Sequence, residues 1–542
     1  MLSEIVGKPV PRKEGRSKVT GAARYVDDLR MPGMLYGATV RSPVARGRIR
    51  SVNFGEGIPW DEFVVVTAKD IPGDNAVALI LSDQPYLATD FVNHAEEPIL
   101  LLAHEDKHLL ERARRAVTFD IEPLPPIFTL EESLAQTEII WGADNVFKSY
   151  LVNKGNVDEV WPQADLIVEG EYSTGAQEQL YIETNGVIAV ANADEGVTVW
   201  GSMQCPYYVH KALLKLFALP PERVRVVQCE TGGGFGGKEE YPSMIGGHAA
   251  LLSWKAGGRP VKIIYDRAED MAATTKRHPS LTRHRTAVTR DGRLLGMEIE
   301  FVVDGGAYAT LSAVVLSRGT IHAAGPYNCP NVRIRSRAVA TNVPPHGAFR
   351  GFGAPQSIFA LERQMDKVAE AVGLSPAEFR RRNFIREGET TATGQIIREP
   401  VDMAGLLARA FALTDYEAKR ERFARENAAA GATLKRGIGF ASFMHGAGFT
   451  GSGEDYLKSI VGAEADAEGR VRVLAASTEI GQGTNTIFAQ IASAALRLDY
   501  DLVEMAQPDT GNVPDSGPTV ASRTCMIVGK LVESAALGLR QT

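Results

Sequence analysis

Four segments of this chain share one local pattern, in which an apolar strand-like run enters a glycine-rich turn and a helix-like stretch follows. We call these turns loop 1 (residues 232–237, GGGFGG), loop 2 (347–356, GAFRGFGAPQ), loop 3 (478–484, TEIGQGT) and loop 4 (516–524, SGPTVASRT). Glycine adopts positive φ and lets a ligand approach the backbone closely. Bare amides beside a helix N-terminus suit an anion such as phosphate. Each loop is therefore a candidate anion-binding turn.

Loop 1 also matches two nucleotide-binding patterns. It satisfies G-x-G-x-x-G, with Asp266 at the end of the next strand as a ribose-binding acid. It satisfies G-x-x-x-x-G-K as well, but Glu239 stands where a P-loop needs Ser or Thr for magnesium. A nucleotide site and a plain packing turn both stay open for this loop taken alone. One mononucleotide needs one such loop, so four loops favour a larger polyanionic cofactor held by several helix N-termini.

Length and composition exclude several classes of protein. A chain of 542 residues, 44% of them hydrophobic, is too long for one core and predicts two or more domains. The net charge of −7 and the scattered basic residues argue against nucleic acid or a membrane surface as partner. Residues 1–20 lack the apolar core of a signal peptide, so we expect a cytoplasmic protein. Four cysteines without a C-x-x-C pair predict no disulfide framework, zinc site or iron–sulfur cluster.

Strand-like and helical segments predict a small α/β domain over residues 1–140. Residues 34–42, 62–68 and 97–104 have strand patterns, and residues 106–118 have a helix pattern. A proline-rich stretch then predicts a boundary at 140–150, followed by a second domain over 150–400. A charged break between 385 and 435 separates it from a third unit over 430–542. Just before that break, Gly373 is expected to close one helix and Ser375-Pro376 to start the next.

Four ordered motifs resemble one family. GGGFGGKE, AFRGFGAPQ, EIGQGTNT and SGPTVAS are similar to motifs of the molybdenum-binding subunit of xanthine dehydrogenase and aldehyde oxidase-like molybdenum hydroxylases. The N-terminal GRSKVTGAARYVDDLRMPGMLYGATVRS resembles the opening of that family's hammerhead domain. The resemblance implies a mixed α/β multidomain fold, with a hammerhead-like domain before molybdopterin-binding domains. It also implies hydroxylation of a carbon next to nitrogen in a heteroaromatic ring, or of an aldehyde carbon, with oxygen from water.

The resemblance assigns residues to the cofactor. In that family the dithiolene of a pterin holds the molybdenum, so no side chain of this chain is expected to be a metal ligand. Gln204 resembles the glutamine close to the oxo group, although taken alone it is an ordinary polar residue after a strand. The other positions that resemble those lining the cofactor are Gly234, Phe235, Gly236, Arg350, Gly481, Gln482, Thr519, Ser522 and Thr524. The hydroxyl-bearing residues among them also suit helix caps.

The resemblance assigns a second set of residues to the substrate. Glu239 and Arg318 resemble the polar pair with which xanthine-oxidising members hold a purine, and with Gln204 they form the expected catalytic set. Phe352 and Phe449 resemble the rings that sandwich a flat substrate. Without the family, Glu239 is a first-turn helix glutamate and both phenylalanines are core residues. A carboxylate and a guanidinium anchor opposite edges of a ring, so a planar N-heterocycle is favoured over a simple aldehyde.

The expected reaction needs partners. Two electrons must leave the reduced molybdenum, and this chain shows neither clustered cysteines for iron–sulfur centres nor a separate flavin domain. The resemblance therefore implies a small iron–sulfur subunit and an FAD subunit on other chains. The cofactor is either molybdopterin or molybdopterin cytosine dinucleotide, and the sequence leaves both open.

One expected residue is missing. In the family, the base that deprotonates the molybdenum-bound hydroxide is a glutamate in a G-E-P-like motif beyond the region that ends here at Thr542. The Gly-Glu pairs of this chain begin at Gly55, Gly170, Gly388 and Gly453, and none is followed by proline. We therefore expect either a truncated sequence or one half of a split subunit, whose partner chain brings the glutamate and the rest of the second cofactor domain. The alternative function is a non-catalytic cofactor-binding half, and the chain is expected to be poorly soluble or inactive alone.

Overall fold

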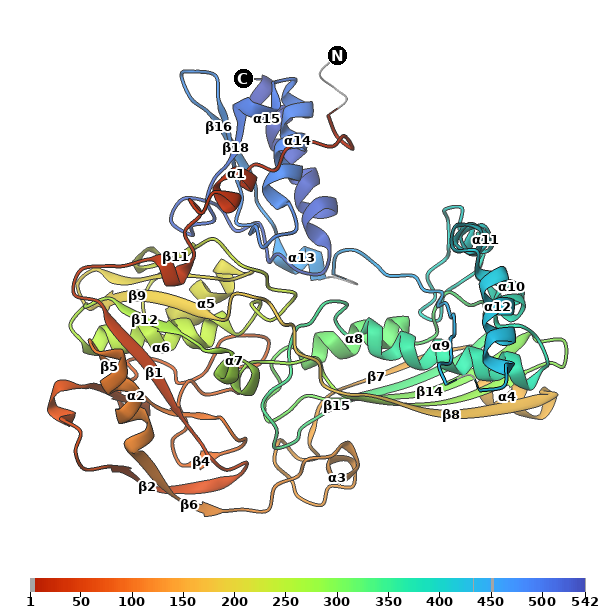
Figure 1. Ribbon diagram of the computed structural model, residues 1–542, viewed down its shortest axis with the longest axis horizontal. Helices are drawn as coiled ribbons and strands as arrows, with labels where there is room; N and C mark the ends of the chain where they lie inside the picture. The colour runs from red at the N-terminus through yellow and green to blue at the C-terminus, as the bar shows by residue number, and fades with distance from the viewer. Residues whose placement is uncertain (1–4, 432, 450–452, 542) are drawn as a thin grey trace.

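The structure is a computed structural model that describes residues 5–431, 433–449 and 453–541, and β-sheets form its framework (Figure 1). Within these ranges there are two large sheets, of seven and five strands, and two small sheets of three strands each. Helices pack against each large sheet. This arrangement confirms the expected mixed α/β class.

The seven-stranded sheet joins the N-terminal region to the region after it. Its order is β11-β10-β9-β12-β1-β5-β3. The join is a parallel pairing of β1 with β12, in which Leu35 lies opposite Val261. Residues on both sides of the expected boundary at 140–150 therefore share one sheet. The strands are β1 (Leu35–Arg41), β3 (Val64–Thr67), β5 (Pro98–His104), β9 (Gly186–Asn192), β10 (Gly196–Gly201), β11 (Val224–Gln228) and β12 (Val261–Ile264).

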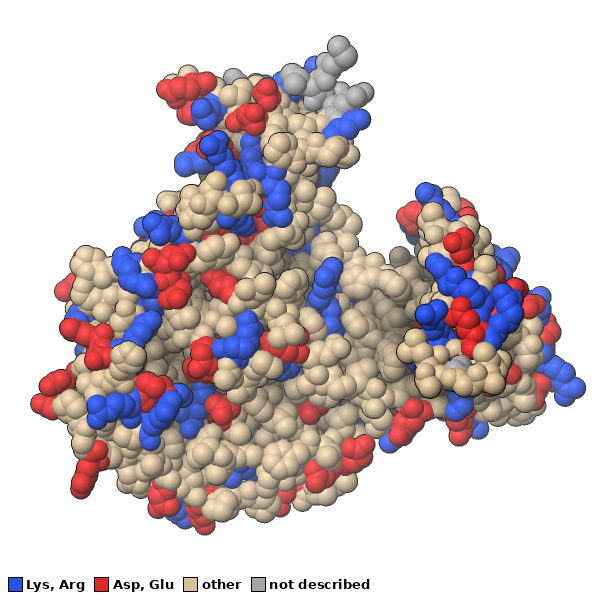
Figure 2. All heavy atoms as spheres, in the orientation of Figure 1, with Lys and Arg blue, Asp and Glu red and all other residues tan. Residues whose placement is uncertain are grey.

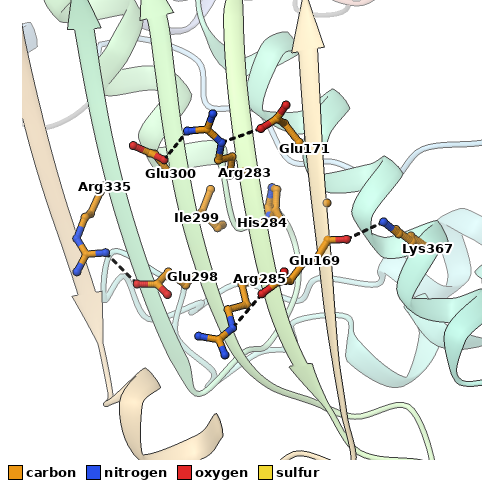
Figure 3. Close-up of a pocket in the computed structure, with 11 residues that line it drawn as sticks. Glu169, Glu171, Arg283, His284, Arg285, Glu298, Ile299, Glu300, Arg335 and Lys367 are labelled. Carbon is orange, nitrogen blue, oxygen red and sulfur yellow. Dashed lines mark hydrogen bonds and ion pairs between the residues drawn. The ribbon is translucent and has the colours of Figure 1, made fainter. Parts of the chain in front are cut away.

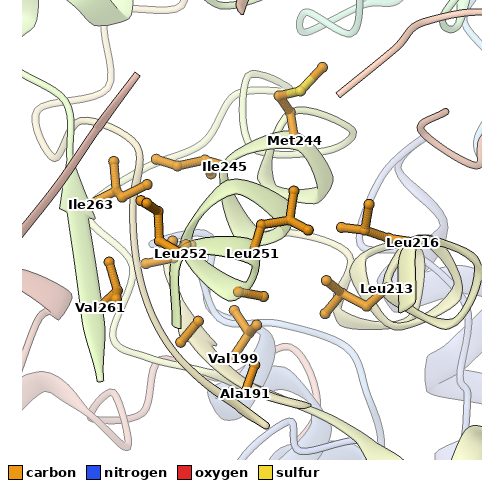
Figure 4. Close-up of a cluster of buried hydrophobic side chains, with 14 of the residues drawn as sticks. Ala191, Val199, Leu213, Leu216, Met244, Ile245, Leu251, Leu252, Val261 and Ile263 are labelled. Atoms are coloured by element: carbon orange, nitrogen blue, oxygen red, sulfur yellow. The ribbon is translucent and has the colours of Figure 1, made fainter. Parts of the chain in front are cut away.

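The largest buried cluster lies between this sheet and helices α5 (Pro206–Phe217) and α6 (Pro242–Lys255) (Figure 4). Helix α6 is buried from Pro242 through Ser253, which agrees with its lack of a polar face. Gly247 on α6 lies so close to the ring of Tyr86 that a Cβ would come within 2.3 Å of Cε1. The core therefore holds α6, and with it the chain that leads out of loop 1, in one place.

The five-stranded sheet has the order β7-β15-β14-β13-β8, and helices α8 (Ser312–His322) and α9 (Ala354–Ala371) pack against it. Charged side chains form pairs across the strands around a hollow of about 680 Å³, where Arg283 lies between Glu171 and Glu300 (Figure 3). The charges alternate in sign from strand to strand, so each row neutralises the next. The strands are β7 (Val146–Lys154), β8 (Leu166–Thr174), β13 (Ser280–Val288), β14 (Leu294–Asp304) and β15 (Asn331–Val339).

Two small sheets complete the framework, β4-β2-β6 and β16-β17-β18. The second belongs to a C-terminal unit with its own buried cluster, which Figure 1 shows projecting from the body beside the N-terminal segment. The strands are β2 (Gly47–Phe54), β4 (Phe91–Val92), β6 (Val117–Pro123), β16 (Gly462–Ala465), β17 (Val471–Leu474) and β18 (Val503–Met505). The remaining helices are α1 (Gly15–Val19), α2 (Lys107–Ala116), α3 (Leu130–Leu134), α4 (Val157–Val160), α7 (Arg267–Ala273), α10 (Pro376–Asn383), α11 (Met403–Thr414), α12 (Tyr416–Ala428), α13 (Gly453–Leu457), α14 (Thr484–Leu496) and α15 (Gly529–Gln541).

The helix end and helix start that the sequence predicts near residue 375 agree with the structure. Gly373 follows α9 with φ of 71°, and the Ser375 side chain accepts from the amide of Glu378 at the start of α10. Both features confirm the expected helix end and helix start. Basic and acidic residues are interspersed on the face shown in Figure 2. In the described ranges, no helix has the length and apolar character needed to cross a membrane.

Candidate functional site

Gln204 lies where three of the four glycine-rich loops meet. It follows β10 and is 3% exposed. Its side-chain Oε1 accepts from the amide of Gly236 in loop 1 at 2.9 Å, and its Nε2 donates to the carbonyl of Thr519 in loop 4 at 3.2 Å. Its own carbonyl accepts from the hydroxyl of Thr478 in loop 3 at 3.1 Å. The residue expected near the reactive centre therefore connects loops that lie up to 315 positions from it in the sequence.

Loop 1 is a left-handed turn that ends before its helix begins. Gly233, Phe235 and Gly236 have φ of 94°, 51° and 106°. Helix α6 follows the loop as expected but starts only at Pro242, so Glu239 precedes the helix and its interpretation as a first-turn helix glutamate is wrong. A Cβ on Gly234 would lie 2.5 Å from Oε1 of Gln204. Glycine is therefore required here by the close approach of Gln204.

A buried ion pair holds loop 1 in place. Lys238 is fully buried, and its Nζ donates to Oε2 of Glu183 at 3.0 Å and to the hydroxyl of Ser202 at 2.8 Å. The same Glu183 oxygen accepts from the amide of Gly232 at 2.7 Å. Burial lowers the pKa of Lys238, and the neighbouring Glu183 opposes this shift. Lys238 thus binds a carboxylate of the protein itself. The lysine of a P-loop instead binds a phosphate, so this contact does not fit the P-loop alternative.

The dinucleotide alternative is not supported by the position of Asp266. Its side chain accepts from the amide of Glu269 at 2.8 Å and caps helix α7. The capping function accounts for an aspartate at this position without a ribose.

Loop 2 is attached directly to loop 1. The amide of Arg350 donates to the carbonyl of Phe235 at 2.9 Å. Oε1 of Glu240 accepts from the amide of Ala348 at 3.1 Å, while Nε2 of Gln179 donates to the carbonyl of Ala348 at 2.8 Å. Both backbone groups of one loop 2 residue are therefore held by side chains from outside the loop, which makes the two loops one rigid unit.

Two arginines lie at loop 2. Arg277 donates through Nη2 to the carbonyl of Arg350 at 2.8 Å and lies 4.0 Å from the ring centroid of Phe349. Its Nη1 is buried and has no hydrogen-bond partner among the described residues, and burial lowers the pKa of Arg277 to about 10. The Arg350 side chain is exposed and, in the part of the chain that the structure describes, makes no hydrogen bond or ion pair. Loop 2 thus has positive charge beside it and hydrogen-bond donors that are available to a ligand.

Loop 3 binds a carboxylate of its own. The side chain of Glu479 accepts from the amides of Gly481 at 2.7 Å, Gly483 at 3.1 Å and Asn485 at 3.2 Å. Gln482 is also turned inward, since its Oε1 accepts from the amide of Ile480 and its Nε2 donates to the carbonyl of Thr478 and the hydroxyl of Thr484. The amides of these glycines are therefore already satisfied inside the loop.

Loop 4 is fixed by Thr519 and Arg523. The Thr519 hydroxyl accepts from the amide of Thr478 in loop 3 at 2.8 Å. Arg523 is fully buried, donates to the carbonyl of Ser516 at 2.9 Å and forms an ion pair with Glu454 at 2.8 Å. Thr524 opens a π-helical turn without a side-chain cap, so the capping alternative for these hydroxyls is wrong. Ser522 has φ of 54°, a conformation that non-glycine residues rarely adopt.

The two expected substrate anchors lie in different surroundings. Glu239 is 3% exposed, and burial together with the adjacent carboxyl of Glu240 raises its pKa well above the ordinary value. Arg318 on α8 is 4% exposed and donates to the carbonyls of Gly446 at 2.8 Å and Gly448 at 2.5 Å. Both groups are therefore buried, and Arg318 is held by the segment from Gly446 to Gly448.

The two expected aromatic residues lie beside the elements that carry these anchors. Phe352 is a half-buried loop 2 residue with φ of 52°, and the next residue, Gly353, packs so closely on α8 that a Cβ would lie 2.1 Å from the carbonyl of Val315. Phe449 is half-buried and directly follows the Gly446 to Gly448 segment that Arg318 binds. The backbone at both residues therefore lies near α8.

Several residues at the site were missed by the sequence analysis. Lys238 and Glu240 adjoin loop 1, and their charge next to a glycine loop was the available signal. Glu183, Gln179 and Arg277 lie far from every loop in the sequence, and no local pattern marks them. Their importance depends on contacts that only the folded chain makes.

Comparison with known families matches the chain from near its start to its last residue. The aldehyde oxidase and xanthine dehydrogenase a/b hammerhead domain matches residues 20–125, which confirms the expected hammerhead-like domain. Molybdopterin cofactor-binding domains match residues 142–384 and 409–542.

Individual relatives agree with these matches. A probable xanthine dehydrogenase subunit of Bacillus subtilis is 33% identical over 98% of this chain and 70% of its own length. The nicotinate dehydrogenase large molybdopterin subunit of Eubacterium barkeri is 35% identical over 75% of this chain and 96% of its own. The solved aldehyde oxidoreductase of Desulfovibrio gigas superposes with a TM-score of 0.89 at 28% identity, covering 99% of this chain and 60% of that one. The chain therefore belongs to the xanthine dehydrogenase and aldehyde oxidase family of molybdopterin-dependent oxidoreductases.

Proposed function

We propose that this chain binds the molybdenum cofactor where loops 1, 3 and 4 meet at Gln204 and takes part in hydroxylating a planar N-heterocycle. The observation that carries the proposal is the pair of hydrogen bonds in which the Gln204 side chain accepts from the Gly236 amide and donates to the Thr519 carbonyl. These bonds orient one buried amide at the junction of loops from two matched cofactor-binding domains. A preoriented polar group of this kind suits the binding of a cofactor's reactive end.

The residues present fit such a cofactor. A Cβ on Gly236 would lie 2.7 Å from the carbonyl of Ala348, so the two loops approach with bare backbone. Nη1 of Arg277 and the guanidinium of Arg350, neither of which has a partner in the described part of the chain, add donors at loop 2. Guanidinium groups and backbone amides together are the donors that phosphate and pterin oxygens need. Loop 3 would contribute through the outer surface of Gln482 rather than through the glycine amides that Glu479 already occupies.

The chain's own residues have distinct functions in this proposal. The bound cofactor supplies a metal centre that accepts two electrons and delivers oxygen drawn from water. Gln204 holds a fixed amide beside that centre. Burial and the adjacent Glu240 raise the pKa of Glu239, which favours a protonated carboxyl able to donate to a ring nitrogen or exocyclic oxygen. Arg318 contributes positive charge, and Phe352 and Phe449 offer flat faces to a planar ring.

The substrate class rests on Glu239 and Arg318 and on the names of relatives. Xanthine and nicotinate, named for two relatives, are both N-heterocycles. An aldehyde is the second candidate, because an aldehyde oxidoreductase shares the fold at 28% identity. A simple aldehyde has no ring edges for a carboxyl and a guanidinium to bind, and this difference favours the heterocycle.

The proposal extends to partners. Electrons would pass to a small iron–sulfur subunit and an FAD subunit, in line with relatives that are themselves named as subunits.

The first test measures cofactor and turnover together. The full chain, produced in a host that makes molybdopterin, should hold molybdenum and pterin in equal amounts, and the mass of the released pterin shows whether a cytidine nucleotide is attached. Turnover of xanthine or nicotinate with an artificial electron acceptor should appear after the partner subunits are added. Cofactor without turnover in the complete assembly would support the non-catalytic alternative. Absence of molybdenum and pterin would contradict the proposal.

The second test separates the two substrate classes. Arg318→Met should lower kcat/KM for the heterocycle by roughly 10- to 100-fold, because a charged hydrogen bond is lost, and should change aldehyde turnover much less. Because Arg318 also holds the carbonyls of Gly446 and Gly448, unfolding of the variant is measured alongside. Equal losses for both substrates in a folded variant would remove Arg318 from the substrate site.

A further inference from the structure

The N-terminal segment, residues 5–19, lies on the C-terminal unit (Figure 1). Nε2 of Gln490 donates to the carbonyls of Ile5 and Lys8 at 2.8 and 3.0 Å. The hydroxyl of Tyr500 donates to the carbonyl of Pro11 at 2.9 Å, and Nζ of Lys13 donates to the carbonyl of Tyr500 at 2.6 Å. The first part of the chain is thus attached to a unit that lies 482 to 489 positions away along the sequence.

Within this segment, Arg12 reaches loop 3. Its Nη2 forms an ion pair with Oε1 of Glu479 at 3.1 Å, and its Nη1 donates to the carbonyl of Gly481 at 3.0 Å. Glu14 binds the same guanidinium from the other side, with Nε of Arg12 donating to its Oε1 at 2.8 Å. Arg12 therefore contacts both the carboxylate inside loop 3 and the backbone of its left-handed glycine.

The carboxylate that Arg12 contacts determines the shape of loop 3. Glu479 is 6% exposed and fills the turn formed by the amides of Gly481 and Gly483, which have φ of 108° and 96°. Successive amides in such a turn form an anion-binding concavity. Here the anion is part of the chain, and Arg12 is the cation that balances it. Gln228 adds a hydrogen bond to the Glu479 carbonyl at 2.9 Å.

We propose that Arg12 is a positioning residue that locks loop 3 around Glu479 and thereby fixes the position of Gln482, whose exposed side is the part of loop 3 proposed to meet the cofactor. This inference rests on the proposed function for its cofactor consequence. By this proposal the N-terminal segment becomes part of the cofactor site, although none of the family's loop motifs includes it. The side chain of Arg12 is 44% exposed, so its removal should loosen the loop without unfolding the unit.

The test compares four full-length chains: wild type, Arg12→Ala, Arg12→Lys and Lys13→Ala. Lys13 is the matched control, because its Nζ binds Tyr500 rather than loop 3. Amide hydrogen exchange is followed in residues 478–486, and molybdenum and pterin retained after gel filtration are measured in parallel. Arg12→Ala should speed exchange of these amides by up to about fivefold, as expected for loss of an exposed ion pair, and should retain less cofactor than Lys13→Ala.

The conservative variant separates positioning from a general structural effect. Arg12→Lys should recover part of the protection, because an ammonium keeps the charge but cannot contact Glu479 and Gly481 together in a planar fork. Unchanged exchange in Arg12→Ala, or an equal increase in Lys13→Ala, would overturn the inference. Absence of cofactor from wild type would instead contradict the proposed function, while the exchange measurement still decides whether Arg12 locks the loop.

Discussion

Loops 1 and 3 are both left-handed glycine turns, yet the protein holds them in opposite ways. Loop 1 is supported by Lys238 and Glu183, an ion pair with a fully buried ammonium. Loop 3 is shaped by its own Glu479, whose cation, Arg12, has a side chain that is 44% exposed. Breaking a buried pair costs about 3 to 5 kcal/mol, whereas exposed pairs are worth about 0.2 to 1 kcal/mol. One turn is therefore part of a domain core, and the other depends on a surface contact from a distant segment.

The sheets beneath the loops explain the difference. Loop 1 continues from β11 of the seven-stranded sheet, beside the largest buried cluster, where a charge has to be paired inside the protein. Loop 3 continues from β17 of a three-stranded sheet with a smaller cluster. A small unit buries less surface, so its loop needs support from outside.

Among the substitutions that test this comparison, removal of the buried Lys238 ammonium should cause the largest loss of stability. Lys238→Met leaves Glu183 without its cation, and the free energy of unfolding should fall by about 3 kcal/mol in urea denaturation. Glu183 is 19% exposed, which keeps the loss at the lower end of the range for buried pairs. The double variant Lys238→Met with Glu183→Gln should recover part of the stability, because no unpaired charge remains. A loss below that of Arg12→Ala would reverse the comparison of the two loops.

The next largest effect should come from Gln204, which connects the two regions. Gln204→Ala leaves the part-buried amide of Gly236 and the buried carbonyl of Thr519 without this partner, so the free energy of unfolding should fall by about 1 to 3 kcal/mol and cofactor content should fall with it. Gln163→Ala is the control, since Gln163 donates to an exposed helix carbonyl. If both variants unfold at the same denaturant concentration and keep equal cofactor, Gln204 does not join the loops in solution.

A smaller, pH-dependent effect should come from Glu239. Its folded pKa is raised, so the neutral form stabilises the fold below the ordinary glutamate pKa, and this contribution is lost as pH rises toward the folded value. Wild type should therefore lose stability as pH rises above the ordinary glutamate pKa of 4.5, relative to Glu239→Gln, which has no titrating group at position 239. Turnover should fall in the same variant. Glu222→Gln, at an exposed position, should leave the pH profile of stability unchanged, and parallel profiles for wild type and Glu239→Gln would contradict the burial argument.

The smallest effect on stability should come from Arg350. Arg350→Ala should change the free energy of unfolding by less than about 0.5 kcal/mol, because its side chain makes no hydrogen bond or ion pair with a described residue. Cofactor retention should nevertheless weaken by roughly tenfold, as for loss of one charged hydrogen bond to an anion. Arg363→Ala on α9 serves as the control, since that side chain is 62% exposed and pairs with Asp366. Equal retention in the two variants would remove Arg350 from the cofactor site.

Much of the local structure could be predicted from the sequence. The N-cap at Ser375 and the left-handed Gly373 were predictable because each depends on residues within one helical turn. The start of α6 lies later than the glycines suggest, because glycines near a helix say little about where the first helical hydrogen bond forms. The capping function expected for the loop 4 hydroxyls failed for a related reason. Thr519 found a partner in Thr478, 41 positions away.

The sequence by itself determined which turns this chain can form and to which family it belongs, because glycine positions and ordered motifs are local properties. Only the tertiary structure decided which charges balance one another. Lys238 is paired with Glu183, and Glu479 rather than a ligand fills the amide turn of loop 3. Buried charges and amides bind whichever partner the fold brings within hydrogen-bond distance. Lys238 and Glu183 are 55 positions apart, and Arg12 and Glu479 are 467 positions apart, so no local sequence pattern predicts either contact.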